Sequence, residues 1–186
     1  EKYATDAAVD SSVVLNKMFL DFDAHGEPLE KAFKDLCKIT SILRVEDVYF
    51  NMYFSGKGFH VIVHGEKVND IRSIQSYFST LAEYAPTLDR SGIQVKRLRR
   101  IPNTVNLNSE GPYFCIPITE EDLEKGVDWI IQKATFGNYP SIRYGSKLKS
   151  WPEVKPIEIS EIEITAPKPV GELPVIPCLY NAIMVE

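Results

Sequence analysis

An apolar segment that ends in two aspartates constrains the fold of this chain more than any other feature. Residues 13–20 read V-V-L-N-K-M-F-L, and Asp21, Phe22 and Asp23 follow. The pattern predicts a β-strand, in which alternate side chains point to the same face. Asp21 and Asp23 therefore project together, while Phe22 turns into a core. The two carboxylates repel each other, and a divalent cation between them would relieve that repulsion. An acidic turn without a cation is the alternative.

The length, charge and cysteine content narrow the class of protein. The chain has 186 residues, a formal net charge of −5 and three cysteines. This length suffices for one domain with a substantial core. No apolar run approaches the roughly 20 residues of a membrane span, and the cysteines lack zinc-site or disulfide-framework spacing. We therefore expect a cytoplasmic protein without a membrane segment. Because the chain begins at Glu1, we also expect it to be a fragment or a processed chain.

Two segments have the spacing of amphipathic helices. In residues 29–43, which follow a turn at Pro28, apolar side chains recur every three or four positions. Cys37 lies on this apolar stripe and is expected to be a buried structural thiol. A second helix is predicted from Asn69, as its N-terminal cap, to Tyr84.

A hairpin turn separates two predicted strands between these helices. Its sequence is Ser55-Gly56-Lys57-Gly58, and the two glycines predict a tight turn that a ligand can approach closely. The Ser55 hydroxyl, the Lys57 ammonium and the backbone N–H groups suit phosphate oxygens. His60 follows on the next strand, within reach of the same phosphates. A hairpin without any ligand is equally consistent with this stretch alone.

A basic segment follows the second helix. Asp89 stands in an L-D-R-S-G turn, and residues 96–100 read K-R-L-R-R, which is four of the 21 basic residues. Residues 105–107 predict a further short strand. A run of charges is typically a solvated face. Beside a pair of carboxylates, however, such a run also suits the recognition of phosphates.

The ordered combination of these features resembles the catalytic core of the archaeo-eukaryotic primase superfamily. It is most similar to the small catalytic primase subunit and to plasmid-type primase-polymerases. The resemblance covers roughly residues 13–118 and rests on D-x-D, S-G-K-G-F-H, L-D and R-L-R-R-I-P-N-T-V-N in that order. It implies that Asp21, Asp23 and Asp89 hold two catalytic divalent ions, Mg²⁺ or Mn²⁺.

The resemblance also implies a site for the triphosphate of an incoming nucleotide. Its residues would be Ser55, Lys57, His60, Arg97 and Arg100, with Gly56 of the hairpin also contacting the nucleotide. Asn106 stands where many relatives carry a histidine, and its amide can still donate to a phosphate or sugar. Many relatives have a zinc-binding insertion between the second and third motifs, and this chain has no cysteine there.

The implied activity is nucleotidyl transfer by a primase or polymerase that synthesises or extends primers in DNA replication. Expected partners are a single-stranded DNA template, a primer strand, nucleoside triphosphates, and a helicase or other replication proteins. The implied fold is α+β, an antiparallel sheet of RNA-recognition-type units with helices on one face and the active site on the other.

Two alternatives share this fold, a gap-filling repair polymerase and a catalytically silent nucleic-acid-binding module. The presence of all three aspartates argues against the silent module. A metal-dependent nuclease would also use aspartates, but it has no incoming nucleotide for the hairpin and basic segment to hold. The sequence does not distinguish ribonucleotides from deoxynucleotides as substrates.

The C-terminal half adds a strand over residues 113–118 and a helix capped by Thr119. Residues 135–152 combine aromatic and basic side chains. Two interpretations fit this loop, packing against the core, which is favoured, and stacking with a single-stranded template.

We expect the catalytic domain to span residues 1–165, ending in an edge strand in which Ile and Glu alternate. Residues 166–186 would form a Pro-rich linker and the truncated start of another domain. The phrase around Cys178 resembles the opening of the iron–sulfur domain of the large primase subunit. One cysteine cannot hold a cluster, so none is expected in this fragment, although the full-length protein is a candidate for one. An inert terminal cysteine is the alternative.

Overall fold

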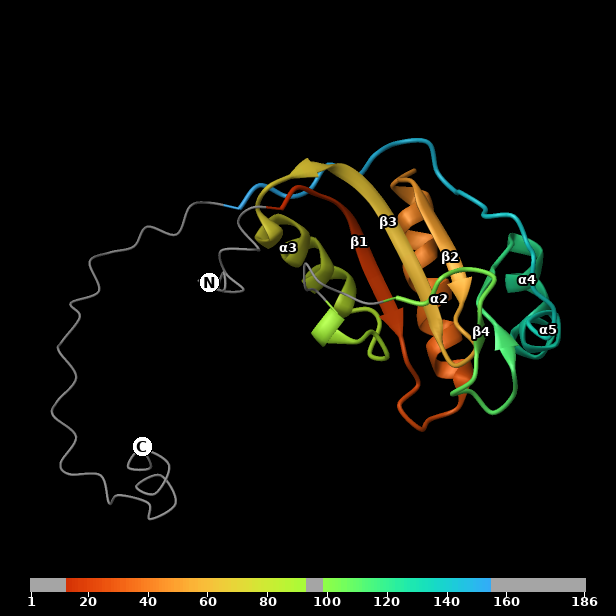
Figure 1. Cartoon of the computed structure of the whole chain (residues 1–186). Coiled ribbons are helices and arrows are strands. Elements are labelled where there is room, and N and C mark those ends of the chain that lie inside the picture. Colours follow the sequence, from red (N-terminus) through yellow and green to blue (C-terminus); the bar gives the residue numbers. More distant parts are fainter. Residues whose placement is uncertain (1–12, 93–98, 155–186) are drawn as a thin grey trace, which may run out of the picture. The chain divides into compact units, whose positions relative to one another are not determined.

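A four-stranded antiparallel sheet, in the order β1-β3-β2-β6, forms the centre of the protein (Figure 1). The computed structural model describes residues 13–92 and 99–154. The chain divides into two units after Val154, and the described residues belong to the first. The elements of the described residues are β1 (Leu15–Phe22), α2 (Leu29–Val45), β2 (Phe50–Phe54), β3 (Phe59–Val68), α3 (Ile71–Ala82), the 3-10 turn η1 (Arg90–Gly92), β4 (Val105–Asn106), β5 (Tyr113–Phe114), β6 (Ile116–Pro117), α4 (Glu120–Lys125) and α5 (Val127–Lys133).

The connections place the ends of several strands side by side. Helix α2 connects β1 to β2, and β3 lies between these two strands, so the three strands and the helix form a split β-α-β unit. Beyond β1, Leu88 forms an antiparallel bridge with Phe22 at the edge of the sheet. The fold is therefore α+β with an antiparallel sheet, as predicted.

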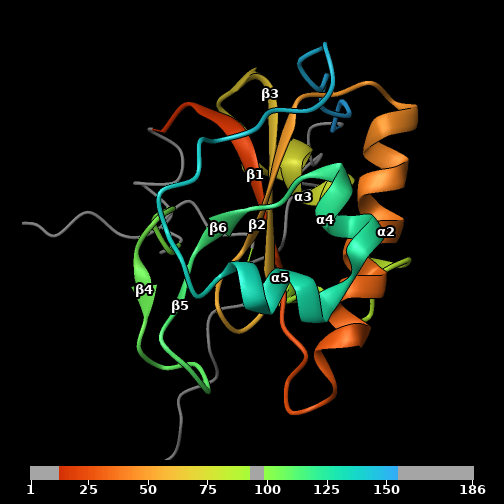
Figure 2. The same ribbon diagram turned by 90° about the vertical axis from the view of Figure 1, so that its right-hand side faces the viewer.

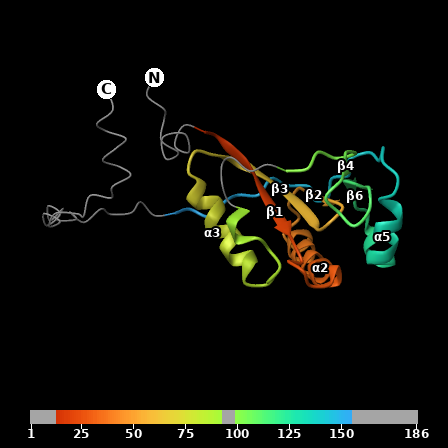
Figure 3. The ribbon, with the colours of Figure 1, turned by 60° about the horizontal axis from the view of Figure 1, so that its bottom comes forward.

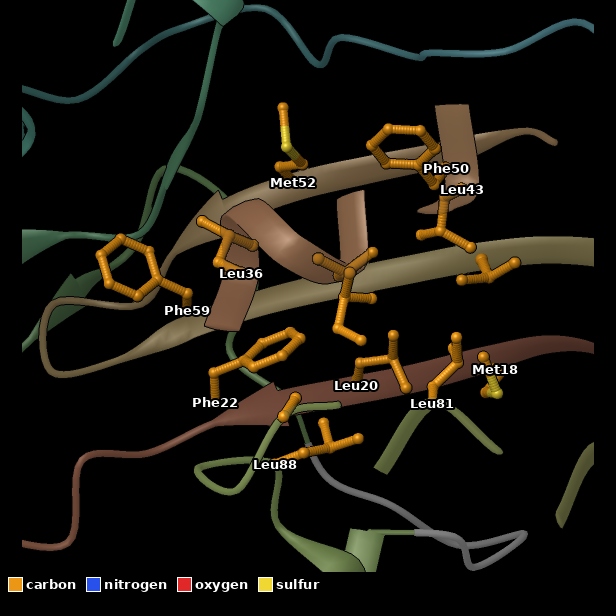
Figure 4. Close-up of a cluster of buried hydrophobic side chains, with 14 of the residues drawn as sticks. Met18, Leu20, Phe22, Leu36, Leu43, Phe50, Met52, Phe59, Leu81 and Leu88 are labelled. Carbon is orange, nitrogen blue, oxygen red and sulfur yellow. The ribbon is translucent and has the colours of Figure 1, made fainter. Parts of the chain in front are cut away.

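Strand alternation gives the sheet two different faces. Met18, Leu20 and Phe22 of β1 are buried, and they meet Leu36 and Leu43 of α2 (Figure 4). Helices α2 and α3 lie on this same side of the sheet (Figure 3). The other face has no such helix cover in this view. On that face, Tyr53, His60 and Ile62 are buried, whereas Asp21 is half-buried and Lys17 is exposed.

Both predicted helices are present, with two corrections of detail. Cys37 of α2 is half-buried, not buried. The cap of α3 is Asp70 rather than Asn69, because Asp70 Oδ1 accepts a hydrogen bond from Arg72 N at 2.9 Å. The same carboxylate also binds the Arg72 guanidinium, and this pairing fixes where the helix begins.

The predicted strand over residues 113–118 is split in two. The N–H of Cys115 donates to Thr104 O at 2.8 Å, so the chain changes partner there, and β5 pairs with β4 whereas β6 pairs with β2 (Figure 2). The helix after Thr119 is split as well. Gly126 has a φ of 86°, which ends α4 before α5 begins.

Tyr139, Tyr144 and Trp151 of the loop over 135–152 pack against the core, as the favoured interpretation predicted, whereas Phe136 is exposed. The Tyr144 ring stacks on Phe50 with centroids 5.2 Å apart. Trp151 is buried, and its Nε1 donates to Glu66 O at 2.8 Å. These two rings are therefore not available to stack on a template. The predicted edge strand, the linker and Cys178 lie outside the described residues.

Candidate active site

A hollow of about 190 Å³ opens where β1 and the β2–β3 hairpin end. It brings together seven of the residues that the sequence singled out, and Gly58 and Arg99 in addition. The lining residues are Asp21, Asp23, Ser55, Lys57, Gly58, His60, Arg99, Arg100 and Asn106. Gly56 and Asp89 do not line this hollow, and Arg97 lies outside the described residues.

The D-x-D pair has the predicted arrangement. Phe22 is fully buried, whereas the flanking Asp21 and Asp23 are half-buried and line the hollow. Asp21 is paired in register with His60 of β3. The Nε2 atom of His60 lies 3.3 Å from Asp21 Oδ1, so the imidazole contacts the candidate metal ligand as well as the hollow.

Asp23 is oriented by the turn that follows it. Its Oδ1 accepts a hydrogen bond from the His25 N–H at 3.1 Å, and its own N–H donates to Thr87 O at 3.1 Å. His25 and Gly26 have φ angles of 48° and 87°. This left-handed turn reverses the chain directly after the carboxylate and holds it at the rim.

Asp89 is brought to the site by its backbone, but its carboxylate is engaged elsewhere. The Asp89 N–H donates to Asp21 O at 2.8 Å. Its Oδ1 accepts hydrogen bonds from Ser91 N at 2.9 Å and from Ser91 Oγ at 2.7 Å. The backbone of Asp89, the predicted third ligand, therefore lies next to the backbone of Asp21. Its side chain stabilises the η1 turn through Ser91.

The S-G-K-G turn is a closed hairpin with one exposed cation. Ser55 Oγ accepts from Gly58 N at 3.1 Å and donates to Gly58 O at 3.0 Å. Gly56 has a φ of 90°, as a tight turn requires. Lys57 is exposed. In this arrangement the Ser55 hydroxyl stabilises the turn, and the Lys57 ammonium is the group presented to a ligand.

The Asn106 side chain connects β4 to the hairpin by a hydrogen bond. It is buried, and its Nδ2 donates to Ser55 O at 2.9 Å. Its Oδ1 accepts from Asn108 N at 3.0 Å. Both ends of the amide are therefore used within the protein. The sequence predicted a contact with phosphate or sugar here, whereas the described contacts tie β4 to the hairpin.

Two neighbouring arginines face the hollow. Arg100 is half-buried, and its Nη1 donates to Val105 O at 3.4 Å, while Arg99 is exposed. Burial raises the pKa of the nearby Cys115 thiol to about 11, although Arg100 and Arg99 act in the opposite direction. This thiol therefore stays protonated near neutral pH and is not a nucleophile. Arg99 was not among the predicted ligands. Its place in R-L-R-R, beside Arg100, was the available signal.

The donor set suits a hard divalent cation in part. Carboxylate oxygens are the ligands that Mg²⁺ and Mn²⁺ prefer, and Asp21 and Asp23 offer them at one rim. Among the described residues, no three His, Cys, Asp or Glu side chains are grouped to hold a metal ion. Two protein carboxylates and the oxygens of a bound phosphate would form such a set.

No model of a protein family matches the chain, and no curated protein matches it. In the part of the chain that the structure describes, no helix has both the length and the apolar character needed to cross a membrane. The case for a function therefore rests on the geometry of the hollow.

Proposed function

We propose that the chain is a nucleotidyltransferase of the primase–polymerase type, which adds nucleotides to a strand paired with a single-stranded DNA template. One observation carries this proposal. The carboxylates of Asp21 and Asp23 line the same small hollow as the cationic Lys57 and Arg100 and the imidazole of His60. A metal-bound triphosphate requires carboxylates to bind the divalent ions and cationic side chains to bind the phosphates. Both kinds of group line this hollow.

Each side chain has a role in this proposal. Asp21 and Asp23 would hold divalent ions, which when bound lower the pKa of an attacking hydroxyl and neutralise the leaving pyrophosphate. Lys57 and Arg100 bind the β- and γ-phosphate oxygens and stabilise the negative charge that develops there. His60 donates a hydrogen bond to a phosphate oxygen from one ring nitrogen and keeps its contact with Asp21 through Nε2.

The reaction itself is a displacement at phosphorus. The 3′-hydroxyl oxygen of a primer forms a bond to the α-phosphorus, the bond from that phosphorus to the bridging oxygen breaks, and pyrophosphate leaves. The hydroxyl proton is released. The protein contributes mainly position and charge, because phosphoryl transfer gains most from alignment and electrostatic stabilisation.

A second hollow next to the first would accommodate the rest of a nucleotide. It has a volume of about 390 Å³ and shares Asp23 and Lys57 with the site. Phe54 and Tyr113 contribute apolar surface to its lining, and Ser109 contributes a hydroxyl. An apolar wall with a few polar groups is typical of a pocket for a sugar and base. This supports a nucleotide rather than inorganic phosphate as the ligand.

The topology is consistent with the same proposal. The split β-α-β unit of β1, α2 and β2 around β3, with Leu88 bridged to the outer edge of β1, follows the strand order of an RNA-recognition-type unit. That pattern supports the proposed core but does not by itself indicate an activity, because one fold serves many functions.

The proposal is tested by templated incorporation on a primed single-stranded DNA, with Mg²⁺ or Mn²⁺ and with ribo- and deoxynucleotides assayed separately. Asp21→Asn and Asp23→Asn should each lower the rate by roughly two to three orders of magnitude. Their thermal stability should be unchanged or slightly higher, since one of two repelling charges is removed.

Asp128→Asn is the matched control, because Asp128 is exposed on α5 and lines neither hollow. It should keep full activity. Activity that survives in both site variants would refute the proposal. Comparing gapped, primed and unprimed templates in the same assay separates a gap-filling polymerase from a primase.

A further inference from the structure

Cations continue from the hollow along the open face of the sheet. Lys17 of β1 is paired in register with His64 of β3, as Asp21 is paired with His60. The two pairs have the same parity and therefore share a face. Four residues separate them along each strand, which corresponds to about 13 Å. The face with the candidate carboxylates thus extends well beyond the hollow.

Three cations act on His64. Its pKa is lowered, first by burial and then by the charges of Lys17, Arg143 and Arg99, and Lys17 is its register partner on β1. His64 Nε2 lies 2.6 Å from Asn51 Oδ1. We call Lys17, Arg99 and Arg143 the basic strip. They come from β1, from the segment before β4 and from the loop that follows α5.

The three side chains of the basic strip are exposed. Within the described residues, none of its three side chains forms an ion pair. Elsewhere, several exposed lysines have acidic partners, as Lys31 has Glu27 at 2.9 Å and Lys125 has Glu121. The chain as a whole carries a net charge of −5, so the strip reverses the local sign. Clustered like charges raise the local potential and attract a polyanion.

Aromatic rings accompany these cations. The Arg143 guanidinium lies over Tyr49, with 5.4 Å between its central carbon and the ring centroid. Phe19 meets His60 edge to face at 4.9 Å. Both aromatic rings are half-buried, and both have the parity of the open face. Partly exposed rings beside cations suit a strand whose bases stack while its phosphates are bound.

We infer that the basic strip binds the phosphates of a single-stranded nucleic acid that runs along the open face into the hollow. Its role as the template strand rests on the proposed function, whereas the binding needs no catalysis. A polynucleotide fits better than a free nucleotide, because the strip extends from Arg99 at the hollow to Lys17, which is about 13 Å from Asp21 along β1. That distance corresponds to roughly four stacked nucleotide steps.

The test is the binding of a fluorescein-labelled oligothymidylate of about twenty nucleotides, followed by fluorescence anisotropy without nucleotide or metal. The double variant Lys17→Ala/Arg143→Ala should bind about tenfold more weakly at low salt. Each lost phosphate contact on a single strand reduces the salt dependence of log K by about 0.7, so the slope should become shallower by about 1.4. Lys34→Ala/Lys125→Ala, which removes the same charge from helices, is the control.

The inference would be overturned if the double variant bound the oligonucleotide with the same affinity, and with the same salt dependence of log K, as the control. An equal loss of affinity for a nucleoside triphosphate would also overturn it, because the strip would then be a general anion site. Circular dichroism and thermal melting confirm that all variants are folded. If Asp21→Asn and Asp23→Asn both retain incorporation, the proposed function fails and the binding result stands. If only the strip variants behave like the control, this inference alone fails.

Discussion

Gly58 is the residue whose small size allows the site to form. A Cβ atom at this position would lie 2.4 Å from Phe22 O, at the end of the D-x-D strand. That distance is far below van der Waals contact, and the atom in the way belongs to the backbone. The hairpin therefore approaches β1 closely enough to present Lys57 beside Asp23 only because residue 58 has no side chain.

Gly58→Ala should separate the hairpin from the end of β1. We expect a loss of about 1–3 kcal/mol of stability from overpacking and weaker binding of a nucleoside triphosphate. Urea denaturation and nucleotide titration measure the two effects. Gly126→Ala is the control, because Gly126 has a φ of 86° with no atom within 4 Å of the added Cβ. It should lose stability through strain alone and keep its nucleotide affinity. Equal nucleotide affinity in all three proteins would show that the close approach is not required.

The position of a single side chain could be predicted from the sequence where it depends only on neighbouring residues in the chain. Asp21 and Asp23 were correctly placed on one face, since strand alternation follows from the sequence alone. The direction of the Asp89 carboxylate depends on its hydrogen bonds to Ser91. The burial of Asn106 depends on a contact with Ser55, which is distant in sequence. Neither contact leaves a periodic signal.

At the scale of elements, a buried ion pair joins α4 to α5. Asp122 is 4% exposed, and its Oδ2 lies 2.5 Å from Lys133 Nζ. The same carboxylate accepts hydrogen bonds from Thr119 N and Trp129 Nε1. Burial alone would raise the pKa of Asp122, but the hydrogen bonds from Lys133, Thr119 and Trp129 outweigh it, and the pKa lies below its ordinary value.

This pair should make stability fall in acid. Because the pKa of Asp122 is lower in the folded state, its contribution is present above the ordinary value of 3.8 and is lost as the pH falls through the folded value. At neutral pH, Asp122→Asn should cost about 2–3 kcal/mol, measured by urea denaturation. Below the folded pKa the difference from the parent protein should shrink. Asp128→Asn is the control, because Asp128 is exposed in the first turn of α5, and losing its charge should cost no more than about 1 kcal/mol. A pH-independent loss in Asp122→Asn would contradict this account.

Helices and strands were predicted correctly where one hydrophobic periodicity extends over the whole element. The boundaries between two consecutive elements were predicted less well. The apolar stripe of α2 identified that helix. The break between α4 and α5 depends on the left-handed conformation of Gly126. The helical spacing of apolar residues continues across this glycine, so the spacing did not indicate the break. The break at Cys115 arises because its N–H bonds Thr104, which is a tertiary contact.

At the scale of the whole molecule, the segment after α5 closes the fold over the sheet. It forms bridges with Phe50 at Tyr144 and with Gly65 at Lys149. Trp151 then packs directly on Gly65, where a Cβ atom would lie 2.1 Å from the indole ring. Residues about 85 positions apart in sequence thus meet, and this long-range contact orders the end of the described domain.

Trp151→Ala should therefore destabilise the whole domain. The ring is 7% exposed, lies edge to face on Tyr77 at 6.1 Å, and donates to Glu66 O. Removing a buried indole typically costs about 3–5 kcal/mol. Phe136→Ala is the matched control, because Phe136 is 70% exposed and should change stability by no more than about 0.5 kcal/mol. Urea denaturation followed by tryptophan fluorescence and by circular dichroism measures both losses. If Trp151→Ala unfolds at the same urea concentration as Phe136→Ala, the segment is only a surface strap, and the core of the domain is complete without it.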